Sequence, residues 1–96
     1  MMALLDEVKL HLRIAGTAYD GEVQLLIDAA KADLQLSGVD PEKVNAATDP
    51  LIKRAIVVYC KAHFGYDNPD AERLERAYAM LKAHLTLSQD YRAEGG

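Results

Sequence analysis

The sequence has little cysteine and no long hydrophobic run. One cysteine stands among 96 residues, so the chain cannot form an internal disulfide, which suits a reducing cytoplasm. No apolar stretch approaches the length that crosses a membrane, and Asp6 and Glu7 interrupt the apolar core that a secretory signal would need near the start. We therefore expect neither secretion nor membrane insertion.

Sequence motifs for catalysis and cofactor binding are also missing. There is no glycine-rich phosphate loop and no His-Glu metal motif at helical spacing. Cys60 and His63 lie three apart, so one helix could direct both toward a metal ion, but this spacing supplies only two ligands. A catalytic Cys-His pair would also need an orienting group and an oxyanion site, which the sequence does not mark. We interpret both residues as packing side chains and predict no metal, no cofactor and no enzymatic activity.

The charge is distributed unevenly along the chain. The net charge is −4, and residues 1–48 hold eight acids and four bases whereas residues 49–96 hold seven of each. Phosphate backbones need neutralising cations, so the acidic first half argues against nucleic-acid binding as the main activity. Lys53, Arg54 and Lys61 remain as a candidate basic patch.

The hydrophobic pattern is helical throughout, and the composition is that of an ordinary globular domain. We predict one all-α domain over residues 1–96, a small bundle of about four helices at roughly 4–13, 20–37, 50–64 and 69–88, with a short helical turn near 41–45. Residues 89–96 lose this periodicity, so we expect a flexible tail unless something holds it.

The helix predicted at 50–64 should be the central one. Asp49 is a good cap, Pro50 sits where a missing N–H costs nothing, and Gly65 supplies a stop. Apolar residues cover one broad arc of this helix: Leu51, Ile52, Ala55, Ile56, Val58, Tyr59 and Ala62. Val57 and Phe64 fall outside the arc. A helix this apolar on most of its surface is expected to be buried.

The other helices each show a core face at helical spacing. These faces are Leu5, Val8 and Leu12 in the first, Val23, Leu26, Ile27, Ala30 and Leu34 in the second, and Leu74, Ala77, Tyr78, Leu81 and Leu85 in the last. Asp20 is the expected cap of the second helix, which should end before Gly38.

Two of the helices carry a second apolar stripe, opposite the core face. One stripe is Leu25, Ala29, Ala32 and Leu36, and the other is Met80, Ala83 and Leu87. Either both stripes are enclosed inside an irregular bundle, or they form contacts between subunits. A heterologous contact between copies that closes on itself makes a ring.

Four stretches together resemble the phage head-tail connector family: LDEVKLHLRI, LLIDAAKADLQ, IKRAIVVYCKAHFG and YAMLKAHLTLSQDYR. The matching positions are Val8, Lys9, Leu12, Ala55, Ile56, Leu81, Lys82, Leu85, Tyr91 and Arg92. Between the last two helices, family members often carry an aromatic and arginine-containing stretch, and this chain has HFGYDNPDAER without tryptophan. This departure from the family pattern concerns the docking surface between the last two helices rather than the fold.

The resemblance implies a structural role in tailed phages and prophages. It implies a homo-oligomeric ring below the portal protein that extends the DNA channel, helps retain packaged DNA and docks the tail-proximal head-completion protein. DNA would pass through without specific binding, and the protein would reside in the virion after assembly in the host cytoplasm. The alternative is a small helical DNA-binding or DNA-packaging module that uses Lys53, Arg54 and Lys61.

Overall fold

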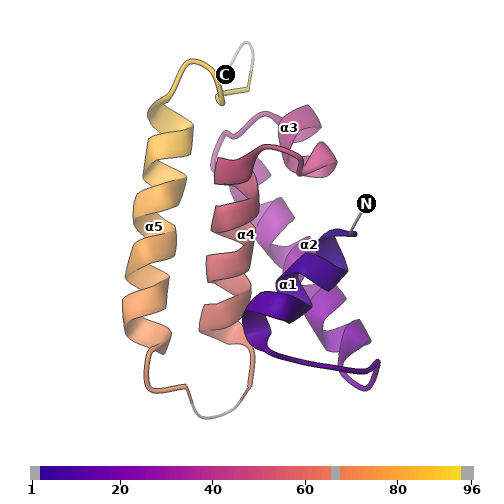
Figure 1. The fold of residues 1–96 in the computed structure, drawn as a ribbon. Helices are drawn as coiled ribbons and strands as arrows, with labels where there is room; N and C mark the ends of the chain where they lie inside the picture. The colour runs from indigo at the N-terminus through magenta and orange to yellow at the C-terminus, as the bar shows by residue number, and fades with distance from the viewer. Residues whose placement is uncertain (1–2, 66–67, 94–96) are drawn as a thin grey trace.

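The computed structural model of the protein describes residues 3–65 and 68–93, where all regular elements are helices (Figure 1). In chain order they are α1 (Leu4–Leu12), α2 (Asp20–Leu36), α3 (Pro41–Ala46), α4 (Pro50–His63) and α5 (Ala71–Leu87). This confirms the predicted all-α bundle, with helix bounds that agree to within two residues.

Helix α4 lies in the middle of the bundle. It packs against α5 on one side and against α2 and α1 on the other (Figure 1). Ile52, Ala55, Ile56 and Cys60 on α4 have no solvent exposure. The expectation of a buried central helix is therefore confirmed.

The ends of α4 follow from local chemistry. The Asp49 carboxylate accepts a hydrogen bond from the backbone N–H of Leu51 at 2.8 Å, which satisfies one of the free donors at the helix start. Pro50 occupies the first helical position, where its fixed φ suits the helix. After the helix, Gly65 adopts a φ of 86°, a left-handed conformation that favours glycine.

One hydrophobic core joins the inner faces of the helices. Its fully enclosed side chains include Val8 from α1, Val23 and Leu34 from α2, and Val44 from α3. Several residues predicted for the core faces are only partly buried at its margin: Leu5, Leu12, Leu26, Tyr59, Ala77 and Leu81. Val57 and Phe64, which the apolar arc of α4 left out, also pack against the core.

Two predictions about helix starts and faces are wrong. Leu51 is 47% exposed although it was placed on the buried arc of α4, because it stands in the first turn, at the rim of the bundle. Asp20 does not cap α2, whose N-cap is Tyr19 without a side-chain hydrogen bond. The Asp20 carboxylate instead lies 2.6 Å from the Lys9 ammonium of α1.

Asp33 links α2 to α5 across the bundle. Its carboxylate accepts hydrogen bonds from the Tyr78 hydroxyl at 2.5 Å and from the Lys82 ammonium at 3.0 Å. Partial burial raises the pKa of Asp33, but these two bonds and the Lys82 charge outweigh it, so the pKa lies below its ordinary value. Burial, together with the same contact to Asp33, raises the pKa of Tyr78.

The segment after α5 returns to the connection between α2 and α3. Val39 and Arg92 form an isolated antiparallel bridge, in which the Asp40 N–H donates to the Tyr91 carbonyl and the Ala93 N–H donates to the Gly38 carbonyl, both at 2.8 Å. Residues 89–96 were expected to be flexible unless something holds them, and this pairing supplies such an attachment for residues 91–93. Residues 94–96 lie outside the described part of the chain.

Side chains add to this attachment. The Tyr91 hydroxyl donates to the Asp49 carboxylate at 2.8 Å, and this bond raises the pKa of Tyr91. The Lys43 ammonium donates to the Asp90 carbonyl and lies 5.0 Å from the centre of the Tyr91 ring. Asp49 thus serves both the start of α4 and the end of the chain, and its pKa is lowered because these hydrogen bonds outweigh its burial.

Candidate functional site

The outer stripe of α2 is exposed to solvent. We use this name for Leu25, Ala29, Ala32 and Leu36, of which Leu36 is 88% exposed and Ala29 is half-buried. At about 100° per residue, these positions lie opposite the α2 face that packs on α4. The chain's own fold therefore leaves the stripe uncovered, and it is not enclosed inside the bundle.

Helix α5 carries an equivalent outer stripe. Its members are Met80, Ala83 and Leu87, with Met80 65% and Leu87 79% exposed. They lie opposite the face that carries Leu74, Tyr78 and Leu85 into the core. Since α2 and α5 flank α4, the two stripes belong to two different outer surfaces of the subunit (Figure 1).

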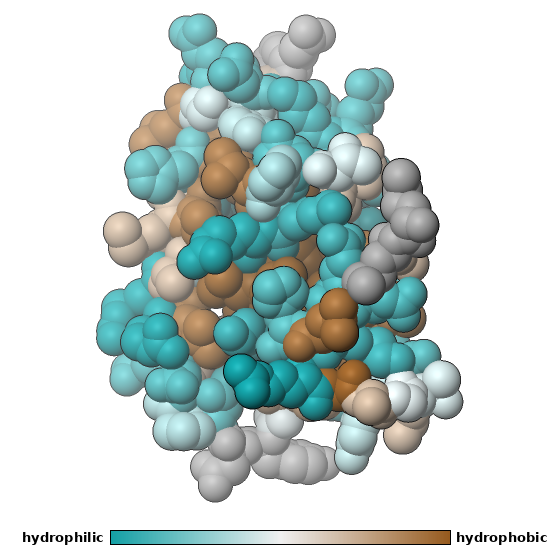
Figure 2. All heavy atoms as spheres, viewed as in Figure 1, coloured by the Kyte–Doolittle hydropathy of each residue, from teal (hydrophilic) through white to brown (hydrophobic). Residues whose placement is uncertain are grey.

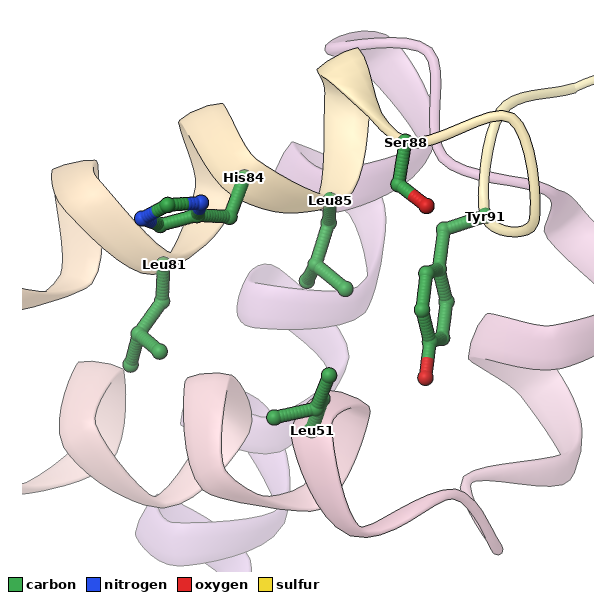
Figure 3. Close-up of a pocket in the computed structure, with 6 residues that line it drawn as sticks. All are labelled: Leu51, Leu81, His84, Leu85, Ser88 and Tyr91. Atoms are coloured by element: carbon green, nitrogen blue, oxygen red, sulfur yellow. The ribbon is translucent and has the colours of Figure 1, made fainter.

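A groove runs between α4 and α5 on the molecular surface. Near the start of α4 it deepens into a hollow of about 370 Å³, lined by Leu51, Leu81, His84, Leu85, Ser88 and Tyr91 (Figure 3). A second hollow of about 290 Å³ is lined by Arg54, Val58, Ala77, Met80, Leu81 and His84. Because Leu81 and His84 line both hollows, they form one continuous surface, which we call the α4–α5 groove.

The groove is predominantly apolar. Figure 2 shows hydrophobic side chains reaching the surface between α5 and α4, bordered by hydrophilic ones. In Figure 3 the Leu51 and Leu85 side chains point into the first hollow, and the Tyr91 ring stands at its end. Neither Leu51 nor Tyr91 was expected to line a groove.

The residues of the candidate basic patch point in different directions. The Lys53 ammonium lies 3.1 Å from the Glu7 carboxylate of α1, which neutralises it. Arg54 instead lines the α4–α5 groove. Lys61 is exposed two turns further along α4. Arg54 and Lys61 thus remain on one side of α4, and Lys53 is directed to another.

Cys60 and His63 do not share a site in the structure. Cys60 is enclosed in the core, and burial raises its pKa to about 12. His63 is exposed, its ring lies 4.4 Å from the Tyr59 ring, and its Nε2 is 3.9 Å from the Glu75 carboxylate. Within residues 3–65 and 68–93, no three His, Cys, Asp or Glu side chains are placed to hold a metal ion.

The sequence match covers the elements that form these surfaces. A family model described as phage connector protein matches residues 4–92, from the start of α1 to the segment that pairs with Val39. The chain belongs to the phage connector protein family. This confirms the family resemblance of its helices. No curated protein and no solved structure gives a match.

Membership of the phage connector family assigns the chain a structural role as a component of the phage particle. The features that matter for such a role are contact surfaces. None of the helices in the described ranges has the length and apolar character needed to cross a membrane. The candidate functional site is therefore the set of exposed apolar surfaces on α2, α4 and α5.

The stripes could be found from the sequence, but the groove could not. A stripe lies on one helix, so its residues recur at a fixed spacing. The groove joins residues from two helices and from the returning C-terminal segment, and no local pattern relates Leu51 to Tyr91.

Proposed function

We propose that the chain assembles with copies of itself into a ring below the portal protein, where it extends the DNA channel and docks the tail-proximal head-completion protein. Membership of the phage connector family supports a structural role of this kind. The observation that carries the proposal is the exposure of apolar surface on two different sides of the subunit, on α2 and on α5.

Surfaces on two different sides favour a ring over a simple dimer. A two-fold dimer uses the same patch on both partners, whereas a ring needs one patch to meet a different patch on the next copy. Leu36 and Met80 belong to different patches, and both side chains are largely exposed. Covering such side chains contributes about 25 cal/mol for each Å² of apolar surface removed from water.

The charge of the chain suits a channel through which DNA moves. A net charge of −4 gives little general attraction for phosphate, so DNA could slide during packaging and ejection without being held. The alternative role as a DNA-binding module has less support, because Glu7 neutralises Lys53 of the basic patch.

The test is the assembly state across a concentration series, measured by light scattering and negative-stain imaging, alone and with purified portal protein. We expect rings from the wild-type chain. We expect Leu36→Glu and Met80→Glu to give folded helical monomers that do not complete phage heads, since each places a charge in a desolvated contact. Leu10→Glu is the matched control, because Leu10 is an exposed leucine on α1, away from both stripes.

Two outcomes would contradict the proposal. A wild-type chain that stays monomeric at all concentrations and also in the presence of portal protein would exclude the ring. Binding to duplex DNA that weakens steeply with salt, without self-assembly, would favour the DNA-binding module instead.

A further inference from the structure

We propose that the α4–α5 groove of one copy receives the outer stripe of α2 from the next copy. The inference rests on the proposed ring and specifies its contact: a helix of one subunit lies in a groove of its neighbour. This is a common mode of recognition, in which apolar side chains at helical spacing enter an apolar groove.

The stripe and the groove match in length. Leu25, Ala29, Ala32 and Leu36 follow one another at intervals of four, three and four residues, which brings them to one side of α2. At about 1.5 Å per residue, Leu25 and Leu36 are about 16 Å apart along the helix. The α5 wall of the groove runs from Ala77 to Ser88, a separation of eleven residues and therefore also about 16 Å.

The stripe and the groove also match in shape. The groove has a hollow at each end, and the stripe has a large leucine at each end with two alanines between. Small residues in the middle of a helix allow it to approach another helix closely. We place Leu36 in the hollow beside Leu51 and Leu85 (Figure 3), and Leu25 in the second hollow beside Ala77.

The charges of the two surfaces are opposite. Helix α2 contains four acids and one base, whereas α4 and α5 together contain six bases and two acids. Some of these charges are already used within the subunit, as in the pair of Asp33 and Lys82. Complementary charge of this kind steers two surfaces together and disfavours other arrangements.

The exposed charges also set the direction of the contact. Glu22 and Asp28 flank the Leu25 end of the stripe, and neither forms an ion pair with another described residue. Arg54 lies in the hollow beside Ala77, and Arg76 precedes Met80 by one turn of α5. Placing acids beside arginines makes the incoming α2 run parallel to α5, which brings Leu36 to the hollow at Leu51.

The occupant is a second copy because one subunit cannot make this contact with itself. The stripe faces away from α4, whereas α4 forms a wall of the groove. Every copy therefore offers one helix and one groove on different sides, which is the head-to-tail arrangement that a ring requires. The contact lies nearer to α4 than the outer stripe of α5 alone would suggest, and of that stripe it includes Met80, which lines the groove.

The test uses two variants that each block one side of the contact. Leu36→Glu alters the stripe, and Leu51→Glu alters the groove in the first turn of α4, where a carboxylate suits the helix dipole and the fold is kept. We expect each variant alone to remain monomeric, with affinity between copies lowered about a hundredfold or more. Circular dichroism confirms that both are folded, and Leu10→Glu serves as the control that assembles like the wild type.

Mixing the two variants gives the decisive result. The intact stripe of the Leu51→Glu chain can enter the intact groove of the Leu36→Glu chain, so we expect a one-to-one heterodimer by analytical ultracentrifugation and no larger assembly. Ring formation by Leu51→Glu alone would overturn the groove contact while leaving the proposed ring intact. A mixture that stays monomeric would also overturn it. A wild-type chain that never assembles would remove both proposals.

Discussion

Two adjacent leucine-sized side chains on α4 allow a direct test of where the core ends. Ile52 is fully enclosed, whereas its neighbour Leu51 is 47% exposed beside the groove. Replacing either by alanine removes the same three carbons, worth about 2.4 kcal/mol at about 0.8 kcal/mol per buried methylene. For Ile52→Ala a residual cavity adds to this, so we expect a loss of about 3–5 kcal/mol in the free energy of unfolding.

For Leu51→Ala we expect a loss of about 1 kcal/mol, because only about half of the side chain is buried and the open groove leaves no enclosed cavity. The assay is urea unfolding followed by circular dichroism, in a Leu36→Glu background so that assembly does not add to stability. With ordinary denaturant slopes the two midpoints should differ by roughly 1–2 M. Equal midpoints, or a lower midpoint for Leu51→Ala, would refute the placement of the core boundary.

Four further predictions concern the polar contacts and the thiol. Tyr78→Phe should lower the free energy of unfolding by about 1–2 kcal/mol, because a hydrogen bond to a charged group is lost. The pKa of Asp33 is depressed, so the stability that it contributes is complete at neutral pH and is lost as the pH falls below about 4; Asp33→Asn should flatten this acid limb of the unfolding curve. The pKa of Cys60 is raised to about 12, so the native thiol should react slowly with a disulfide reagent. For the same reason the free energy of unfolding should decline as the pH rises above about 9. Rapid labelling of the native protein, or stoichiometric zinc by elemental analysis, would contradict the packing role of Cys60. Tyr91→Phe should speed hydrogen exchange at the Ala93 amide, and unchanged exchange would show that the backbone bridge holds this segment alone.

The helices could be predicted because their signals are local. Asp49 with Pro50 starts α4 as expected, and Asp40 with Pro41 starts α3 by the same local chemistry. Asp20 shows the limit of this reasoning, since a carboxylate before a helix can cap it or form an ion pair. The structure has the second outcome because Lys9 of α1 lies within reach, and the pattern of α2 alone contains no information about α1.

The margins of the core and the end of the chain could not be predicted for a related reason. Helical periodicity gives the direction in which a side chain points, but not how far the neighbouring helix that would cover it extends. Leu51 and Ile52 were therefore both predicted to be buried as members of the apolar arc. The attachment of residues 91–93 depends on main-chain pairing with residues 38–40, and main-chain groups are the same in every sequence. The outer stripes could be predicted from the sequence because apolar residues opposite the core face of a helix have no packing role within that helix.

The attachment of the chain end to the loop after α2 has a geometric consequence for the proposed ring. It ties the far end of α5 to the far end of α2, and the Asp33 carboxylate ties the last turn of α2 to Tyr78 and Lys82 in the middle part of α5. The α2 helix that enters the next copy and the groove that receives a helix are thereby held at a fixed angle within each subunit. In a closed ring that angle determines the curvature and hence the number of copies. Loosening the attachment would therefore broaden the range of ring diameters while leaving the contact between neighbours in place.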